Sequence, residues 1–163
     1  MRAGIALGSN VGDRLAHLRR ARGELEKIGG PARASCVYET EPIGAGEEAF
    51  LNAVLEVEFD GQPLALLETL QTIEAHLGRP SKRPRNAPRT IDLDVLYAGN
   101  LVLCNDEIVI PHPRLHQRRF VLQPLADIRP GLVLPGQEKS VAELLASLRD
   151  SARVEVFAET WEP

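Results

Sequence analysis

Residues 88–97 read PRTIDLDVLY and place two acids, Asp92 and Asp94, inside an apolar run. Such a run predicts a β-strand, and side chains two apart on a strand point to the same face. Both carboxylates should therefore project together, while the apolar side chains between them face the core. Two unit charges about 6 Å apart repel by roughly 3 kcal/mol at an effective dielectric constant near 20. A fold that keeps such a pair favours a cation between the two acids.

Two interpretations fit the acid pair when it is taken by itself. In the first, the carboxylates hold a hard divalent ion, Mg²⁺ above all, which prefers carboxylate oxygens and leaves other positions for water and phosphate. In the second, they lie on the solvated outer face of an edge strand, where water weakens the repulsion. The spacing leaves both interpretations open, so the flanking sequence has to decide.

The whole chain has the composition of an ordinary globular protein. Its 163 residues are 44% hydrophobic and 26% charged, which fits a single domain over residues 1–163. We predict a cytoplasmic protein, because the chain has neither a signal peptide's apolar segment nor a membrane-spanning run. We expect Cys36 and Cys104 to be buried free thiols, since they lie in strand-like runs without metal-ligand spacing. We also expect a monomer or a weak homodimer.

The charges are distributed unevenly along the chain. The net charge of −4, from 19 basic and 23 acidic residues, argues against a nucleic-acid partner. Residues 79–89, RPSKRPRNAPR, are nevertheless basic and free of acids, and their prolines predict an exposed, mobile loop. A second basic stretch, IPHPRLHQRR at 110–119, follows the acid pair. Each stretch alone fits a solvated loop, but acids for a metal beside bases for a polyphosphate indicate phosphoryl transfer.

Hydrophobic periodicity and turn signals predict the element order βαββαβ. In chain order, the sequence predicts strands at 4–7, 33–39, 51–59 and 91–97 and helices at 13–28 and 63–77. The strand at 51–59 alternates as a half-buried strand does, and residues 101–103 can pair back on the acid strand as a hairpin. Further elements are predicted at 121–128, from Ser140 and at 153–159. We therefore expect an α+β, ferredoxin-like fold: a largely antiparallel sheet, helices packed on its faces, and C-terminal additions.

The chain resembles the 6-hydroxymethyl-7,8-dihydropterin pyrophosphokinase family of folate biosynthesis in five ordered motifs. They are GSNVGDR, YETEPIG followed by FLNAV, QTIEAHLGR, APRTIDLDVLY, and IPHPRLHQRRFVLQPL. The resemblance spans roughly residues 4 to 128. It implies a ferredoxin-like enzyme that uses ATP and two Mg²⁺ ions to transfer a pyrophosphoryl group to the pterin hydroxymethyl oxygen, with release of AMP.

The resemblance also implies roles for the matching positions. Asp92 and Asp94 would bind the magnesium ions and act in catalysis with Arg89 and Lys82. Contacts to ATP are implied for Gln71, Glu74, Lys82, Arg83, Arg85, Arg89, His112 and Arg118. Contacts to the pterin are implied for Thr40, Pro42, Ile43, Phe50, Asn52 and Phe120. The two phenylalanines would sandwich the pterin ring, and Asn52 would bond its amide edge.

Two other functions stay open from the residues alone. A ferredoxin-like sheet also serves as a non-catalytic module that binds RNA or an effector, and such a module would bind oligonucleotides in a salt-dependent way. The 4% aromatic content and the acid pair argue against it. A metal-dependent phosphodiesterase would need more metal ligands than two aspartates and one histidine.

Overall fold

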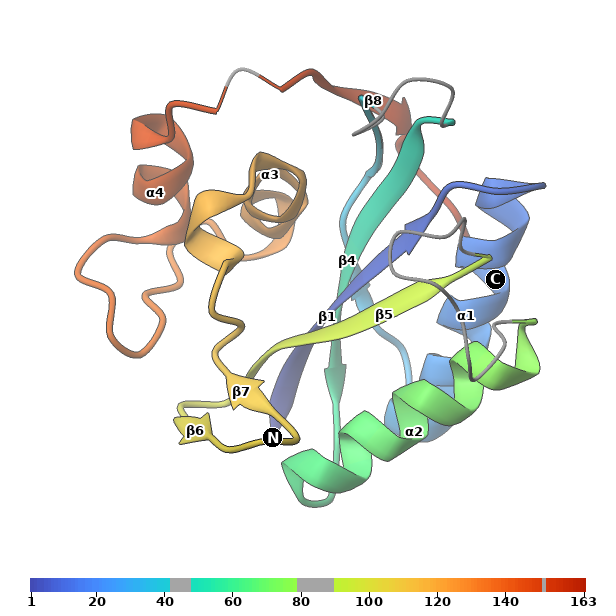
Figure 1. Ribbon diagram of the computed structural model, residues 1–163, viewed down its shortest axis with the longest axis horizontal. Coiled ribbons are helices and arrows are strands. Elements are labelled where there is room, and N and C mark those ends of the chain that lie inside the picture. Colours follow the sequence, from blue (N-terminus) through green and yellow to red (C-terminus); the bar gives the residue numbers. More distant parts are fainter. Residues whose placement is uncertain (42–47, 79–89, 151) are drawn as a thin grey trace.

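The computed structural model describes residues 1–41, 48–78, 90–150 and 152–163. Its central sheet contains the strands β1 (Arg2–Ser9), β2 (Arg33–Ala34), β3 (Val37–Thr40), β4 (Phe50–Glu58), β5 (Asp92–Ala98) and β8 (Val154–Ala158). The strand order is β5-β1-β4-β3-β8, with β2 also paired to β4, and every pair is antiparallel (Figure 1). The predicted antiparallel sheet is confirmed, and β8 is one of the predicted C-terminal additions.

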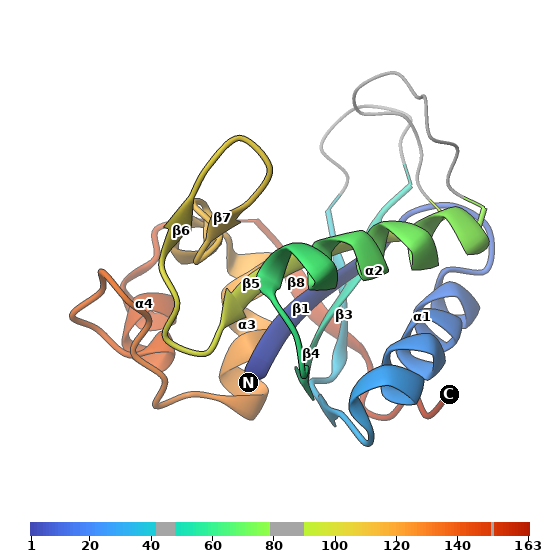
Figure 2. The ribbon, with the colours of Figure 1, turned by 90° about the horizontal axis from the view of Figure 1, so that it is seen from below.

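Helices cover both faces of the sheet, as predicted. One face carries α1 (Arg14–Gly29) and α2 (Pro63–His76); the other carries α3 (Arg119–Ile128), against which α4 (Val141–Ser147) packs (Figure 1). The view from below shows the sheet between these two pairs (Figure 2). A short 3-10 helix, η1 (Leu115–Gln117), leads into α3. In the described part of the chain, every helix is too short or too polar to cross a membrane.

An apolar core lies on each side of the sheet. The core beneath α1 and α2 includes Leu18, Leu25, Leu66 and Leu70, and the core beneath α3 includes Val54, Leu96, Leu122 and Leu125. Strand β4 lies between the two cores and is buried from Leu51 to Val57. The prediction of a half-buried strand was therefore wrong, because α3 covers the face that carries the polar residues.

Glu56 is the charged residue that β4 buries beneath α3. Its carboxylate accepts two hydrogen bonds from Arg129, from Nε at 2.8 Å and from Nη2 at 2.7 Å. The hydroxyl of Tyr97 donates a third at 2.7 Å. Burial alone would raise the pKa of Glu56, but the bonds from Arg129 and Tyr97 outweigh it and lower the pKa below its usual value. Since Arg129 is the C-cap of α3, these bonds fix the end of that helix on the sheet.

Three local predictions need correction. The strand predicted at 33–39 is interrupted between β2 and β3, because the Ser35 hydroxyl accepts the Val54 N–H at 2.9 Å. Residues 101–103 do not pair with β5; instead β6 (Leu103–Cys104) pairs with β7 (Val109–Ile110). The cysteines are free but not buried, since Cys36 is half-buried and Cys104 exposed.

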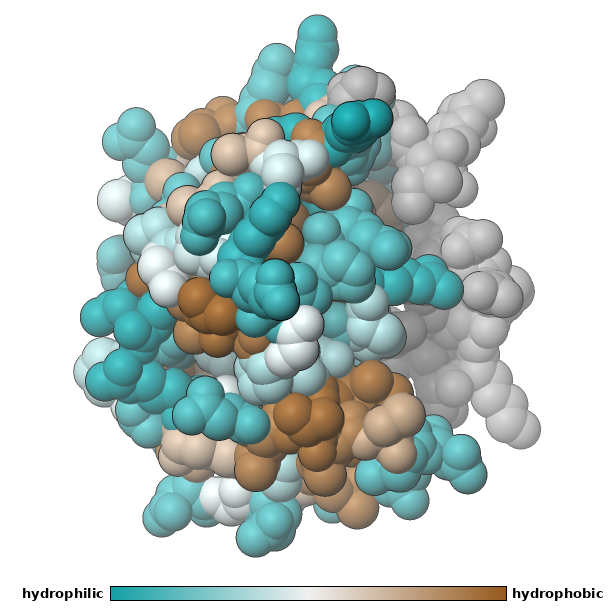
Figure 3. Space-filling model, turned by 90° about the vertical axis from the view of Figure 1, so that its left-hand side faces the viewer, coloured by the Kyte–Doolittle hydropathy of each residue, from teal (hydrophilic) through white to brown (hydrophobic). Residues whose placement is uncertain are grey.

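The hairpin of β6 and β7 and the two residues before it expose apolar side chains. Leu101, Val102 and Val109 are all exposed, and the hairpin lies at the lower left of Figure 1. Figure 3 shows the face on that side, which is mostly hydrophilic with a hydrophobic area in its lower half. Apolar atoms make up much of any protein surface, so this area indicates no partner by itself.

The C-terminal segment returns from β8 to α1. The Trp161 side chain is only 1% exposed, and its Nε1 donates to the Ser35 carbonyl oxygen at 2.7 Å. The guanidinium of Arg22 lies 5.0 Å from the Trp161 ring centroid and donates to the Trp161 carbonyl at 3.2 Å. The segment therefore covers the α1 side of the sheet.

Helix α4 begins with the predicted capping box. The Ser140 hydroxyl accepts the Glu143 N–H at 3.2 Å, and the Glu143 carboxylate accepts the Ser140 N–H at 3.0 Å. We expect Ser140→Ala to lower the free energy of unfolding by about 1 kcal/mol, measured by urea denaturation. Among the described contacts, the Ser147 hydroxyl bonds only carbonyls of its own helix, so the control Ser147→Ala should be near neutral. Equal losses in the two variants would contradict a specific capping effect.

Candidate active site

A cavity of about 530 Å³ lies between the sheet and the segment that leads into α3. Strands β1, β3, β4 and β5 form one wall, and residues 112–121 form the opposite wall. The lining includes the predicted site residues Thr40, Phe50, Asn52, Asp92, Asp94, His112, Arg118 and Phe120. Carboxylates, cations and aromatic rings that are far apart in sequence therefore face one space.

The acid pair lies on the cavity face of β5. Asp92 and Asp94 are paired in register with Gly8 and Ala6 of β1, and the side chain of Leu93 between them is buried on the other side. Asp92 is half-buried and Asp94 is exposed, although both line the cavity. The predicted alternation is confirmed. The two carboxylates lie on an edge strand, and they also line a cavity.

Small residues of β1 make the floor beneath these side chains. A Cβ atom on Gly8 would lie 3.0 Å from Oδ1 of Asn52 and 3.6 Å from the Phe50 ring. A Cβ at this position would therefore push the Asn52 amide aside by a few tenths of an ångström and pack against the Phe50 ring without displacing it. This floor was not predicted, although Gly4, Ala6 and Gly8 alternate as the small residues of one strand face.

Asn52 is held by a hydrogen bond inside the cavity wall. It is only 9% exposed, and its Nδ2 donates to the Thr40 hydroxyl oxygen at 3.0 Å. This bond fixes the orientation of the amide, because one N–H is directed at Thr40 while Oδ1 lies above Gly8. Such a fixed amide suits recognition of a flat, polar heterocycle.

His112 is a neutral hydrogen-bond donor at the opposite wall. Burial, and then the positive charges of Arg118 and Arg114, lower its pKa below the usual value. Its Nδ1 accepts the Arg114 N–H at 3.1 Å, so in the neutral ring the proton lies on Nε2. The backbone N–H of His112 also donates to the Leu96 carbonyl at 2.8 Å, which ties this wall to β5.

Arg118 supplies a positive charge at the same wall. Burial and the charge of Arg114 lower its pKa, whereas Asp94 and Asp92 oppose that shift, so the guanidinium stays charged near neutral pH. The guanidinium carbon lies 5.4 Å from the Phe120 ring centroid. The guanidinium and the Phe120 ring therefore form a cation–π contact at the cavity wall.

Other predicted site residues lie elsewhere. Glu74 and Gln71 of α2 are not among the cavity-lining residues. Glu74 is buried, and its Oε2 accepts the N–H of Leu93, between the two acids, at 2.9 Å. It therefore fixes the edge strand that carries them, and its predicted contact with ATP stays a prediction, as does that of the exposed Gln71. Outside the described residues lie Pro42, Ile43, Lys82, Arg83, Arg85, Arg89 and the rest of the predicted loop at 79–89.

The donor set of the acid pair fits a magnesium ion. Within the described ranges, no three Asp, Glu, His or Cys side chains gather as a ready-made metal site. Two carboxylates beside phosphate-binding cations are the ligands expected for Mg²⁺, which takes few protein oxygens and keeps positions for phosphate and water. A soft-metal site would need thiolates or several imidazoles, which this cavity lining does not contain.

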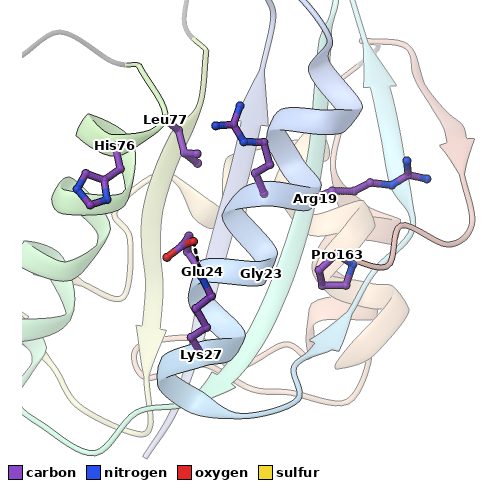
Figure 4. A pocket seen from close by; sticks show the side chains of 8 residues that line it. Arg19, Gly23, Glu24, Lys27, His76, Leu77 and Pro163 are labelled. Atoms are coloured by element: carbon purple, nitrogen blue, oxygen red, sulfur yellow. Dashed lines mark hydrogen bonds and ion pairs between the residues drawn. The ribbon is translucent and has the colours of Figure 1, made fainter.

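A second hollow, of about 440 Å³, lies between α1 and the end of α2. Figure 4 shows Lys27 paired with Glu24, at 2.8 Å, and Arg19 directed away from this pair. Among the described residues that line this hollow there is no aspartate and no Phe, Tyr or Trp. Its charges are paired or dispersed, so the cavity beside β5 is the candidate active site.

Comparisons with known proteins bear on this site. Residues 4–130 match the profile of the 7,8-dihydro-6-hydroxymethylpterin-pyrophosphokinase (HPPK) family. The chain is 43% identical over 127 residues to the 2-amino-4-hydroxy-6-hydroxymethyldihydropteridine pyrophosphokinase of Bacillus subtilis strain 168, covering 76% of this chain and 75% of that protein. It is 41% identical over 153 residues to the protein of the same name from Methylorubrum extorquens, covering 92% and 95%.

A solved structure shares the fold. The crystal structure of Plasmodium falciparum HPPK-DHPS, wild type with pteroate, has a TM-score of 0.72 over 89% of this chain. At 16% identity this likeness shows the fold alone, and the chain spans 42% of the length of that structure. The ferredoxin-like arrangement predicted from the sequence is thereby confirmed. The profile match and the two bacterial relatives show that this chain belongs to the HPPK family.

Proposed function

We propose that the chain transfers the pyrophosphoryl group of ATP to the hydroxymethyl group of 6-hydroxymethyl-7,8-dihydropterin in folate biosynthesis, with the cavity beside β5 as its active site. The products are the pterin diphosphate and AMP. Family membership supports an ATP-dependent pyrophosphokinase, and none of the relatives supports an RNA-binding or effector-binding module. The observation that carries the site assignment is the convergence of Asp92, Asp94, Asn52 and Arg118 in one cavity.

The pterin occupies the part of the cavity between β4 and α3. Phe50 and Phe120 line this part of the cavity, where they would stack on the two faces of the ring. The amide of Asn52, oriented by Thr40, bonds the amide edge of the pterin. Main-chain groups of Pro42 and Ile43 complete this contact in the proposal. Shape and a fixed amide together select a flat heterocycle with paired donors and acceptors.

The phosphates of ATP lie between the acid pair and the opposite wall. Asp92 and Asp94 would hold two Mg²⁺ ions, which would neutralise phosphate charge. Arg118 and the Nε2–H of His112 bind phosphate oxygens. The pterin hydroxyl oxygen forms a bond to the β-phosphorus and loses its proton to solvent, while the bond from that phosphorus to the α-phosphate bridging oxygen breaks, so that AMP leaves. Further ATP contacts are proposed for Gln71, Glu74, Lys82, Arg83, Arg85 and Arg89, with Lys82 and Arg89 also acting in catalysis.

The nucleotide product tests this function directly. Purified chain with ATP, Mg²⁺ and 6-hydroxymethyl-7,8-dihydropterin should form AMP and pterin diphosphate in equal amounts, measured by chromatography. Chelation with EDTA should abolish the reaction, and excess Mg²⁺ should restore it. A sample without pterin is the control and should form no AMP. Formation of ADP, or no reaction, would contradict the proposed function.

Three properties stay predictions from the sequence. They are the cytoplasmic location, the monomeric or weakly dimeric state, and the lack of a nucleic-acid partner. Size-exclusion chromatography with light scattering measures the second, and oligonucleotide titration at low salt measures the third.

A further inference from the structure

Arg14, the last residue of the GSNVGDR motif, makes contacts that the proposed chemistry does not use. It is the first residue of α1, and its Nη1 donates to the Ala49 carbonyl oxygen at 2.7 Å. Its Nη2 lies 2.9 Å from a carboxylate oxygen of Glu39. Its guanidinium carbon also lies 5.6 Å from the ring centroid of Phe157 on β8. One side chain therefore joins the start of α1 to β3, β8 and the residue before β4.

Both chain segments that Arg14 holds are next to predicted pterin-side residues. Ala49 directly precedes Phe50, and Glu39 directly precedes Thr40. Thr40 and Phe50 are themselves partners in the β3–β4 register. Arg14 does not line the cavity, and its side chain is 20% exposed. It therefore acts on the cavity only through the backbone that carries these two residues.

The end of β3 has a second attachment that does not involve Arg14. The Glu41 N–H donates to the Arg153 carbonyl at 3.4 Å, and the Arg153 N–H donates to the Glu41 carboxylate at 3.1 Å. Removal of Arg14 should thus leave Thr40 largely in place. For Ala49, the described contacts show no such second bond to its carbonyl. Phe50 stays paired with Thr40 in the ladder, so we expect the loss of Arg14 to loosen the Ala49 end of β4 more than it loosens Thr40.

We infer that Arg14 is a positioning residue for the pterin, which it serves by fixing the Phe50 backbone against Thr40. The two Nη atoms of Arg14 bond a carbonyl and a carboxylate from one rigid plane, a geometry that the single ammonium nitrogen of a lysine lacks. A small displacement of a stacking ring is enough to weaken binding. The inference rests on the proposed function and deepens it, because it separates pterin affinity from ATP affinity.

The test compares Arg14→Met with wild type in steady-state kinetics. Methionine keeps an unbranched apolar stem but has no donor. We expect KM for the pterin to rise about tenfold, because a Phe50 that is no longer held in place must be ordered again when the pterin binds. The values of kcat and of KM for ATP should change by less than about twofold. Calorimetric titration of the pterin, with a non-hydrolysable ATP analogue and Mg²⁺ present, should show the same loss of affinity.

Two further variants separate positioning from simple destabilisation. Arg14→Lys keeps a charge near Glu39 and should restore part of the affinity, leaving KM for the pterin raised about threefold. If Arg14→Met does not fold, Arg14→Lys carries the test. Arg19→Met is the matched control, because Arg19 is exposed on the same helix and lines only the distant hollow. It should change neither KM.

The outcomes are distinguishable. An unchanged KM for the pterin in both Arg14 variants, with active wild type, overturns the inference alone. Equal rises in both KM values, or a lower kcat that follows the melting temperature, also overturn it, since they indicate a merely structural residue. A wild-type chain that binds no pterin in the titration and forms no AMP overturns the proposed function, and the inference with it.

Discussion

Asp92→Asn and Asp94→Asn should each lower AMP formation by about 10³-fold or more, while the metal-free protein stays folded. A neutral amide is a poor ligand for a hard cation, and the loss falls on charge stabilisation in the transition state. Neither side chain fills the core, since Asp92 is half-buried and Asp94 exposed. Stability should therefore change by no more than about 0.5 kcal/mol. The measurements are single-turnover AMP formation and urea denaturation without Mg²⁺.

The control for this prediction is Asp106→Asn. Asp106 is an exposed acid in the β6–β7 turn, away from the cavity lining. The Asp106→Asn variant should keep full activity in AMP formation. Calorimetry of Mg²⁺ with an ATP analogue should show weaker metal binding only in the Asp92 and Asp94 variants. Loss of folding in either of these would show that the pair is structural rather than metal-binding.

Arg129→Met should lower the free energy of unfolding by about 3 kcal/mol, the size expected when one partner of a buried ion pair is removed. The side chain of Glu56 is only 7% exposed and would keep only the Tyr97 bond among its three described hydrogen bonds. Arg2→Met removes an exposed ion pair, Arg2 with Glu58 at 3.3 Å, and should cost at most about 0.5 kcal/mol. Urea denaturation compares the two. Similar losses of unfolding free energy in the two variants would show that burial does not strengthen the Arg129–Glu56 ion pair.

The same pair predicts a pH dependence. Its bonds lower the pKa of Glu56 in the folded state below the usual 4.5. The carboxylate therefore adds stability that is complete above pH 4.5 and is lost as the pH falls through the lower, folded-state pKa. Wild type should lose stability more steeply than Arg129→Met below pH 4.5. Parallel curves for the two proteins would contradict the role of this bond.

Local sequence signals explain which parts of the fold could be predicted. The period-two acids of β5, the Asp13 cap of α1 and the capping box of α4 depend on neighbours within a few residues, and the structure contains all three. The burial of Glu56 could not be predicted in this way. Its partner Arg129 lies 73 residues away, and only the packing of α3 brings the two together.

The candidate site also contains residues that local sequence predicts and residues that it does not. The acids and the basic segment around His112 could be proposed from residue types alone, because the charged residues of each group lie close together in the sequence. The pterin-binding roles of Phe50 and Asn52 came only from the family resemblance. A single aromatic or amide side chain on a strand shows no sequence pattern that separates a ligand contact from a core contact. The floor at Gly8 and the contacts of Arg14 require strand register and turn geometry, which no local pattern specifies.

The chain contains a single tryptophan, and its position has a spectroscopic consequence. Trp161 belongs to the core on the α1 side, whereas the cavity opens on the side of α3. Its fluorescence should therefore report the docking of the C-terminal segment and not direct contact with a bound pterin. A change in its emission wavelength on ligand binding would show that binding at one face of the sheet alters the packing at the other.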